Sequence, residues 1–277
     1  MDADERQATI QGLIGAEEAL RKAAASRPSL EGPCRAFGRI VRAAIRPMRI
    51  GILGESNSGK STLANFLVGV QTLPALPVAN TRLPALLKFA PSPTVAVLCE
   101  TGKRITLSDS ENLPRGTIKR LEVGLPNPLL HSVEFLDLPG SANVLIQSRR
   151  DPEEHGMDAA IWTTVATQAW RESERTRYLR LPEAVRKRSL LAVTFCDLIN
   201  AEDDVNRLHA RLAASAKPYF REICFLAAGY DDHNDTASMN QFFHTQIDLL
   251  VEEFSTARLV KAAAIGRRLA ESTLGRL

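Results

Sequence analysis

The chain has 277 residues, a length that corresponds to one or two domains. Hydrophobic residues make up 44% and charged residues 24% of it, which is ordinary for a globular protein and excludes a fibrous repeat or a wholly disordered chain. The net charge of +3 is too small to indicate a nucleic-acid partner. The apolar runs are far shorter than the roughly 20 residues of a membrane span, and the first residues lack the pattern of a secretory signal. We therefore expect a soluble chain.

The cysteines and histidines show no metal-binding spacing. The sequence contains neither a Cys-x-x-Cys pair nor a His-Glu-x-x-His motif. Cys99, Cys196 and Cys224 lie in or beside apolar runs, which favours positions in the protein core over disulfides. The expected location is the reduced cytoplasm.

The first elements in the chain are predicted to be helices. Apolar residues at helical spacing predict an amphipathic helix over residues 5–26, ended by Arg27-Pro28, and a second helix over 36–45. Residues 48–53 then have the pattern of a strand, and a helix is predicted over 60–70 after a glycine-bounded loop.

Strands and helices alternate through the middle of the chain. Further strands are predicted over 86–89, 94–100, 133–136, 159–165, 190–195 and 223–227, and helices over 117–121, 169–186 and 203–214. This alternation predicts an α/β fold with a mostly parallel sheet covered by helices on both faces. A long amphipathic helix is expected over about 238–272, with Gly266 as a candidate interruption.

The pattern divides the chain into three segments. Residues 1–47 are expected to form N-terminal helices, residues 48–232 the α/β domain, and residues 233–277 the last helix. Each terminal helix has an apolar stripe that must be buried. The simplest partner for each stripe is the other, so we expect a small helical bundle.

A phosphate-binding loop is the most specific motif in the chain. Residues 54–61, Gly-Glu-Ser-Asn-Ser-Gly-Lys-Ser, match Gly-x4-Gly-Lys-Ser between a predicted strand and a predicted helix. Such a loop turns successive backbone N–H groups toward an anion at a helix N-terminus. Lys60 is expected to bridge the β- and γ-phosphates, and Ser61 to ligate Mg²⁺. The predicted nucleotide-binding residues in this loop are Gly54, Glu55, Ser56, Asn57, Ser58, Gly59, Lys60, Ser61 and Thr62.

Three further residues complete the predicted phosphate and metal site. Asp137 follows the apolar run 133–136 and begins Asp-Leu-Pro-Gly, where the carboxylate would hold the Mg²⁺ shell and the Gly140 N–H would contact the γ-phosphate. In the Pro-rich segment before it, Thr81 is the candidate to cap Mg²⁺ and the γ-phosphate, with Thr72 as the alternative. The predicted metal ligands are therefore Ser61, Thr81 and Asp137.

Recognition of the base is expected at the end of a later strand. Thr194 and Asp197 belong to Thr-Phe-Cys-Asp, in which the carboxylate can accept hydrogen bonds from guanine but not from adenine. Regular GTPases have Asn-Lys-x-Asp or Thr-Lys-x-Asp here, whereas this chain has Phe195 in place of the lysine. Phe195 could stack on the base or belong to the core, and both interpretations stay open.

Activation of the attacking water is predicted to differ from that in Ras-type enzymes, which place Gln directly after Asp-x-x-Gly. Ser141 occupies that position here, so the Thr81 loop, a backbone group or a partner subunit must orient the water. We hypothesise that Asn57 helps to hold K⁺ or Na⁺ beside the phosphates in place of an arginine finger. Bracing of the loop by hydrogen bonds is its alternative role. The predicted catalytic residues are Lys60, Thr81, Asn57 and Gly140.

Together these motifs resemble the dynamin superfamily, in particular bacterial dynamin-like GTPases. The resemblance covers roughly residues 48–230 and rests on residues 54–69, the Thr81-Arg-Leu-Pro segment, residues 137–140 and Thr194-x-x-Asp197. It implies Mg²⁺-dependent binding and slow hydrolysis of GTP, stimulated when two G domains dimerise. It also implies remodelling of a membrane or an assembly. Because the chain has no room for the stalk of full-length members, it resembles a minimal G domain that acts as a homodimer or with a stalk-bearing partner chain.

Two other functions are compatible with the sequence. One is a GTP-binding switch or scaffold with negligible hydrolysis, which Ser141 and Phe195 favour. The other is an RNA- or ribosome-associated GTPase of the Era type, although its usual Asn-Lys-x-Asp is missing. A peripheral contact with an anionic membrane is a further hypothesis, based on Arg42, Arg46, Arg49, Arg267 and Arg268.

Overall fold

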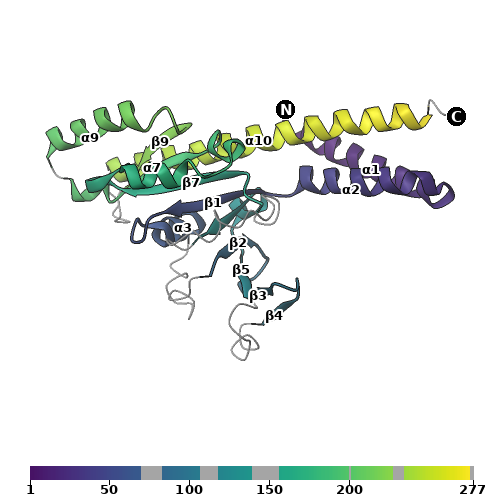
Figure 1. Ribbon diagram of the computed structural model, residues 1–277, viewed down its shortest axis with the longest axis horizontal. Coiled ribbons are helices and arrows are strands. Elements are labelled where there is room, and N and C mark those ends of the chain that lie inside the picture. The colour runs from purple at the N-terminus through teal and green to yellow at the C-terminus, as the bar shows by residue number, and fades with distance from the viewer. Residues whose placement is uncertain (70–82, 107–117, 139–155, 200, 227–233, 275–277) are drawn as a thin grey trace. The chain divides into compact units, whose positions relative to one another are not determined.

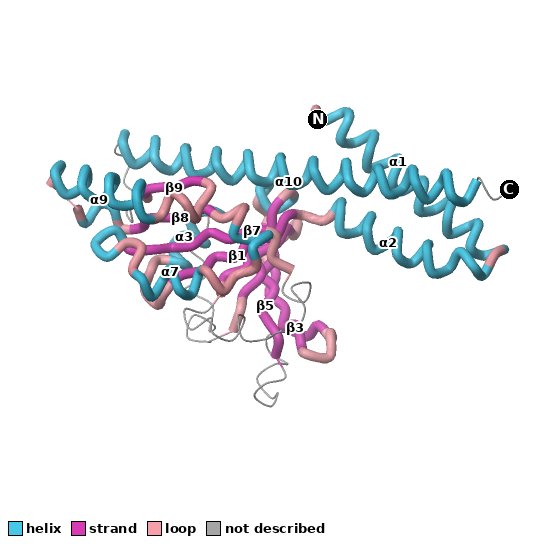
Figure 2. The backbone as a smooth tube through the Cα atoms, turned by 45° about the horizontal axis from the view of Figure 1, so that its top comes forward, coloured by secondary structure: helices cyan, strands magenta, loops and turns pink. Residues whose placement is uncertain are grey.

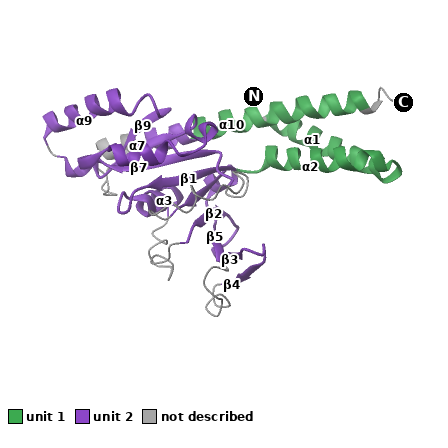
Figure 3. Cartoon of the chain, in the orientation of Figure 1, with its two compact units in different colours: residues 1–47, 248–277 green, residues 48–247 purple. Residues whose placement is uncertain are grey.

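The computed structural model describes residues 1–69, 83–106, 118–138, 156–199, 201–226 and 234–274 (Figure 1). The chain forms two compact units, one made of Met1–Pro47 with Asp248–Leu277 and the other of Met48–Ile247 (Figure 3). The chain passes from one unit to the other at Pro47 and again within its last helix.

The described part of the larger unit contains a nine-stranded sheet with the strand order β4-β3-β5-β2-β6-β1-β7-β8-β9. The strands are β1 (Met48–Gly54), β2 (Ala85–Phe89), β3 (Thr94–Cys99), β4 (Arg104–Thr106), β5 (Ile118–Leu125), β6 (Val133–Asp137), β7 (Ala159–Val165), β8 (Leu190–Thr194) and β9 (Glu222–Phe225). β1 pairs in parallel with β6 and β7, and β8 and β9 continue the parallel half. β2 is antiparallel to β6 but parallel to β5, and β3 is antiparallel to β4 and β5. The predicted α/β fold with a mostly parallel sheet is confirmed.

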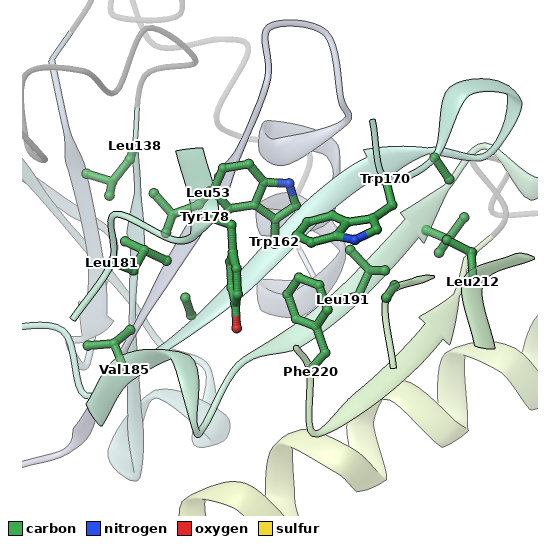
Figure 4. Close-up of a cluster of buried hydrophobic side chains, with 14 of the residues drawn as sticks. Leu53, Leu138, Trp162, Trp170, Tyr178, Leu181, Val185, Leu191, Leu212 and Phe220 are labelled. Carbon is green, nitrogen blue, oxygen red and sulfur yellow. The ribbon is translucent and has the colours of Figure 1, made fainter. Parts of the chain in front are cut away.

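Helices cover both faces of β1. The helices of this unit are α3 (Lys60–Val68), α7 (Glu172–Tyr178), α8 (Glu183–Arg186), α9 (Glu202–Ser215) and the first part of α10 (Asn234–Leu274) (Figure 2). Leu53 of β1 belongs to a buried cluster with Tyr178 of α7, Val185 of α8 and Leu212 of α9 (Figure 4). Ile52, which points to the opposite face, is fully buried as well. Hence the loop that follows β1 starts from a strand enclosed on both sides.

Two predicted helices are wrong. Residues 118–125 form β5 rather than a helix over 117–121, because Leu121, Val123 and Leu125 alternate along the strand and are buried in the sheet. The helix predicted over 169–186 is divided into α7 and α8, since Pro182 lacks a backbone N–H and stands at the N-cap of α8.

The smaller unit consists of α1 (Ala3–Ser26), α2 (Glu31–Ile45) and the remainder of α10. Its core includes Leu13, Phe37, Val41 and Leu259, which come from all three helices. The predicted packing of the N-terminal helices against the last helix is therefore confirmed. α10 continues through Gly266, where a side chain would press on the ring of Phe37. The described helices include none with the length and apolar character of a bilayer span.

One arginine of the hypothetical lipid-binding surface is engaged elsewhere. The Nη2 atom of Arg49 lies 2.6 Å from Oε2 of Glu134 on the neighbouring strand, and the arginine side chain is only 16% exposed. Arg49 therefore contributes little free positive charge to a surface.

Candidate nucleotide-binding site

The turn from β1 into α3 has the backbone conformation of an anion-binding loop. Gly54 has φ +147°, and a Cβ atom there would clash with the carbonyl and hydroxyl groups of Thr163. Asn57 and Gly59 also have positive φ values, and Gly59 is the N-cap of α3. A turn with residues in this region can direct successive N–H groups to one side at a helix N-terminus. The glycines of the motif are thus required by the backbone.

A buried hydroxyl network braces the loop. Ser58 Oγ lies 2.5 Å from Oγ1 of Thr163, whose hydroxyl also lies 2.9 Å from the carbonyl oxygen of Leu53. The hydroxyl of Thr194 lies 2.9 Å from the Ser58 carbonyl and 3.1 Å from that of Thr164, so it can donate to either. The Ser58 and Thr194 side chains therefore hold the loop against β7 and β8. The sequence motif gave no indication of Thr163.

Lys60 is nine-tenths buried in the loop. Its ammonium group donates to the carbonyl oxygens of Glu55 at 2.6 Å and Gly54 at 3.3 Å. Burial lowers the pKa of Lys60, while the negative charges of Asp137 and Glu55 act in the opposite direction. The structure thus holds a cation at the loop where the sequence predicts contact with phosphates.

A hydroxyl and a carboxylate meet beside the lysine. Ser61, at the start of α3, donates from Oγ to Oδ2 of Asp137 at 3.2 Å. Asp137 is at the end of β6, which pairs in parallel with β1, so the two motifs reach the same edge of the sheet. Burial raises the pKa of Asp137 to about 6, against the opposing effects of Lys60 and Ser61. Two hard oxygen donors next to a phosphate-binding loop fit Mg²⁺, which takes few protein ligands and completes its shell with phosphate and water.

The raised pKa of Asp137 predicts a pH dependence of stability. The folded protein binds this proton more tightly than the unfolded chain, in which the carboxyl group has its ordinary pKa of 3.8. The free energy of unfolding of the nucleotide-free protein should therefore fall as the pH rises through the window from about 4 to about 6. We expect Asp137→Asn to remove this part of the profile in urea denaturation, whereas Asp204→Asn, at an exposed acid of α9, should keep it. If the free energy of unfolding depended on pH in the same way in Asp137→Asn and in the original protein, Asp137 would not be the group responsible.

Thr194 and Phe195 of the predicted base-recognition segment lie beside the loop. Phe195 has φ +58° and is half-buried, with its Cε2 atom 3.2 Å from the position of a Cβ atom on Gly59. Asp197 is exposed in the short turn Cys196–Leu198. Phe195 thus packs against the P-loop and keeps part of its surface accessible, which leaves stacking on a base open to it.

The remaining predicted residues are placed as follows. Ser56, Asn57 and Thr62 are exposed, and the Asn57 side chain makes no hydrogen bond with the described residues. Thr81 and Gly140 lie outside the described residues, as do Thr72 and Ser141. The structure therefore brings together the P-loop, Asp137 and the Thr194–Asp197 turn.

Sequence reasoning missed the partners of the Glu55 side chain. Its carboxylate contacts Arg171 at the N-cap of α7, and Ser173 and Arg177 within the helix. These donors follow Glu55 by more than one hundred residues. The local pattern of residues 170–177 does not indicate a contact with the P-loop.

The parallel strands, the loop at the end of β1 and the acid at the end of β6 define the class: the larger unit has a P-loop GTPase fold. Protein-family models give no match to the chain. Over 234 residues the chain is 27% identical to Dynamin-like protein 2 of Campylobacter jejuni subsp. jejuni serotype O:23/36 (strain 81-176), a match that covers 79% of this chain and 38% of the relative.

Two solved structures, both described as an oligomerised bacterial dynamin pair that senses and tethers membranes over long range, share the fold. One has a TM-score of 0.63 and 21% identity over 85% of this chain and 39% of its own. The other has a TM-score of 0.57 and 18% identity over 85% and 38%. The predicted resemblance to bacterial dynamin-like GTPases is confirmed. The chain spans about two fifths of the length of these relatives.

Proposed function

We propose that the chain is a Mg²⁺-dependent, GTP-binding and GTP-hydrolysing dynamin-like protein. The observation that carries this proposal is the buried Lys60 ammonium in a glycine-bounded loop, next to the Ser61–Asp137 pair. The positive charge of Lys60, the N-terminus of α3 and the two oxygen donors are the kinds of groups that bind a triphosphate and its metal ion. The similarity to a dynamin-like protein supports the choice of GTP.

Each residue has a role in the proposed mechanism. The backbone amides of residues 54–62 surround the phosphates, and Lys60 moves its donors from the loop carbonyls to the β- and γ-phosphate oxygens. Ser61 and Asp137 would hold Mg²⁺, and a bound Mg²⁺ would supply positive charge to offset the negative charge that develops on the phosphates. Thr81, Asn57 and Gly140 complete the site in this proposal, with Asn57 beside a K⁺ or Na⁺ ion.

The proposal extends to assembly and membranes. The similar structures are described as an oligomerised pair that tethers membranes. We infer that this chain pairs with a second G domain, in a homodimer or with a stalk-bearing chain, and acts at the cytoplasmic surface of a membrane. The bundle would consist of residues 1–47 and 248–277 and the G domain of residues 48–247, so the second boundary lies later in the chain than the predicted one at 232. Of the basic residues considered above, Arg42, Arg46, Arg267 and Arg268 are the candidates for contact with anionic lipid.

The base preference tests the proposal. The intact chain should bind GTP at least about tenfold more tightly than ATP, because Asp197 can accept two hydrogen bonds from guanine and each charged hydrogen bond contributes about 1.5–3 kcal/mol. Asp197→Asn should remove most of this preference and leave the affinity for inorganic triphosphate unchanged. Competition binding with GTP, ATP and triphosphate in the presence of Mg²⁺ measures both effects. Equal affinities of the intact chain for GTP and ATP would refute the proposal of a guanine-specific site.

A further inference from the structure

A polar clamp joins the P-loop to α7. The carboxylate of Glu55 accepts hydrogen bonds from Ser173 Oγ at 3.1 Å and from Arg177 Nη1 at 3.2 Å, and it lies 3.4 Å from Nη2 of Arg171. The Glu55 side chain is 21% exposed, compared with 54% for Arg171 and 42% for Arg177. The carboxylate is thus the more buried member of each ion pair. We call these four residues the Glu55 clamp.

The same residue holds Lys60 through its backbone. The carbonyl oxygen of Glu55 accepts the 2.6 Å hydrogen bond from the Lys60 ammonium group, while the side chain of Glu55 reaches α7. A shift of Glu55 would therefore displace the first half of the loop and the immediate partner of the lysine together.

The helix that supplies the clamp is firmly attached to the sheet. Glu174 of α7 is 3% exposed, and its Oε2 atom accepts from Thr164 Oγ1 at 3.0 Å and from the backbone N–H of Arg171 at 2.8 Å. Tyr178, at the other end of α7, is fully buried in the hydrophobic cluster that also contains Trp162 and Trp170. The start of α7 follows β7 in the chain, and β7 pairs directly with β1. The start of the helix is therefore held in position beside the loop that follows β1.

The clamp also balances charge. A carboxylate in a loop that binds a triphosphate would repel it, and such repulsion is strong where water is partly excluded. The two guanidinium groups that pair with Glu55 more than offset this negative charge. An ion pair that is only partly exposed is also less screened by salt than one at the open surface.

We propose that Glu55, Arg171 and Arg177 are positioning residues for nucleotide binding, which fix the P-loop to α7 through the Glu55 carboxylate. The inference rests on the proposed nucleotide-binding function and deepens it. Arg171 and Arg177 act through Glu55, and Glu55 acts through the position of the loop backbone.

A double-mutant cycle tests the clamp, with GTP affinity as the first measurement. Arg177→Gln should weaken GTP binding by about 5–10-fold and Glu55→Gln by about threefold, as expected for a partly buried charged pair. The double variant should bind no more weakly than Arg177→Gln, since both substitutions break the same Glu55–Arg177 ion pair. Arg177→Lys should restore most of the affinity, because only one nitrogen of Arg177 contacts the carboxylate.

The matched control is Arg207→Gln in α9, which breaks an Arg–Asp pair whose side chains are 76% and 58% exposed. It should leave GTP affinity unchanged. Single variants that bind GTP like this control would overturn the proposal. Losses that multiply in the double variant would do the same.

Hydrogen exchange provides a measurement that does not depend on nucleotide. In the nucleotide-free full chain, Glu55→Gln and Arg177→Gln should each raise deuterium uptake in the peptide that covers residues 54–62, and Arg207→Gln should not. Uptake equal to that of the original protein would reject the clamp even if GTP binds. If the original chain fails to bind GTP but the exchange result holds, the proposed function is wrong and the anchoring of the loop stands.

Discussion

Replacing Lys60 with alanine is expected to reduce single-turnover GTP hydrolysis by at least about 10³-fold. The reason is that a preorganised cation at the developing phosphate charge supplies several kcal/mol of transition-state stabilisation. The Lys60 side chain is 9% exposed and already desolvated in the loop, so its charge acts with little screening. The measurement is GTP cleavage with enzyme in excess, in Mg²⁺ and at several protein concentrations.

The control for this variant is Lys187→Ala, at an exposed lysine that pairs with Glu183 within α8 and its C-cap. It should hydrolyse GTP at the original rate. A rate for Lys60→Ala within tenfold of the original would contradict the assigned role. If the original protein binds GTP but hydrolyses it no faster than Lys60→Ala, the function is that of a GTP-binding switch or scaffold instead.

Replacing Tyr178 with alanine should lower the free energy of unfolding by about 3–5 kcal/mol, the range for removal of a large buried aromatic side chain. The Tyr178 ring is fully buried, with its centroid 5.8 Å from that of Trp162, 5.6 Å from that of Trp170 and 4.5 Å from that of Phe220 (Figure 4). Alanine would leave a cavity where α7 meets the sheet. Urea denaturation followed by circular dichroism measures the loss.

Tyr178→Phe separates ring packing from hydrogen bonding at this position. The hydroxyl group donates to the carbonyl oxygen of Tyr219 at 2.8 Å, with that of Arg186 at 3.2 Å as the alternative acceptor. The phenylalanine variant keeps the ring and should lose only about 0.5–1.5 kcal/mol. Equal losses for the two variants would show that the packing of the ring contributes little.

The arrangement of the candidate site could be predicted where its parts follow local rules. The loop at 54–61 needs positive φ values at particular positions, so glycines mark it in the sequence. Asp137 could be placed beside Ser61 because both follow neighbouring strands of a parallel sheet. The roles of all the predicted residues stay predictions, and Thr81 and Gly140 also lie outside the described residues.

The errors and omissions have physical causes. β5 begins with Ile-Lys-Arg-Leu, in which the spacing of the apolar residues also suits a helical turn. The segment forms a strand because it pairs with β2 and β3, which the local sequence does not reveal. Glu55 and Arg177 are 122 residues apart and Ser58 and Thr163 are 105 apart. Such polar contacts depend on the assembled sheet, and no periodicity along the chain encodes them.

In the proposed complex, the base and the phosphates of the nucleotide would be recognised by parts of one packed unit, because the Phe195 ring lies beside Gly59. The Thr194 hydroxyl can donate to the Ser58 carbonyl, and the neighbouring Phe195 ring touches the glycine that begins α3. Free energies measured for substitutions in the turn after β8 and in the loop after β1 should therefore be non-additive. Variants of Phe195 that change the choice of base should also alter the affinity for free triphosphate.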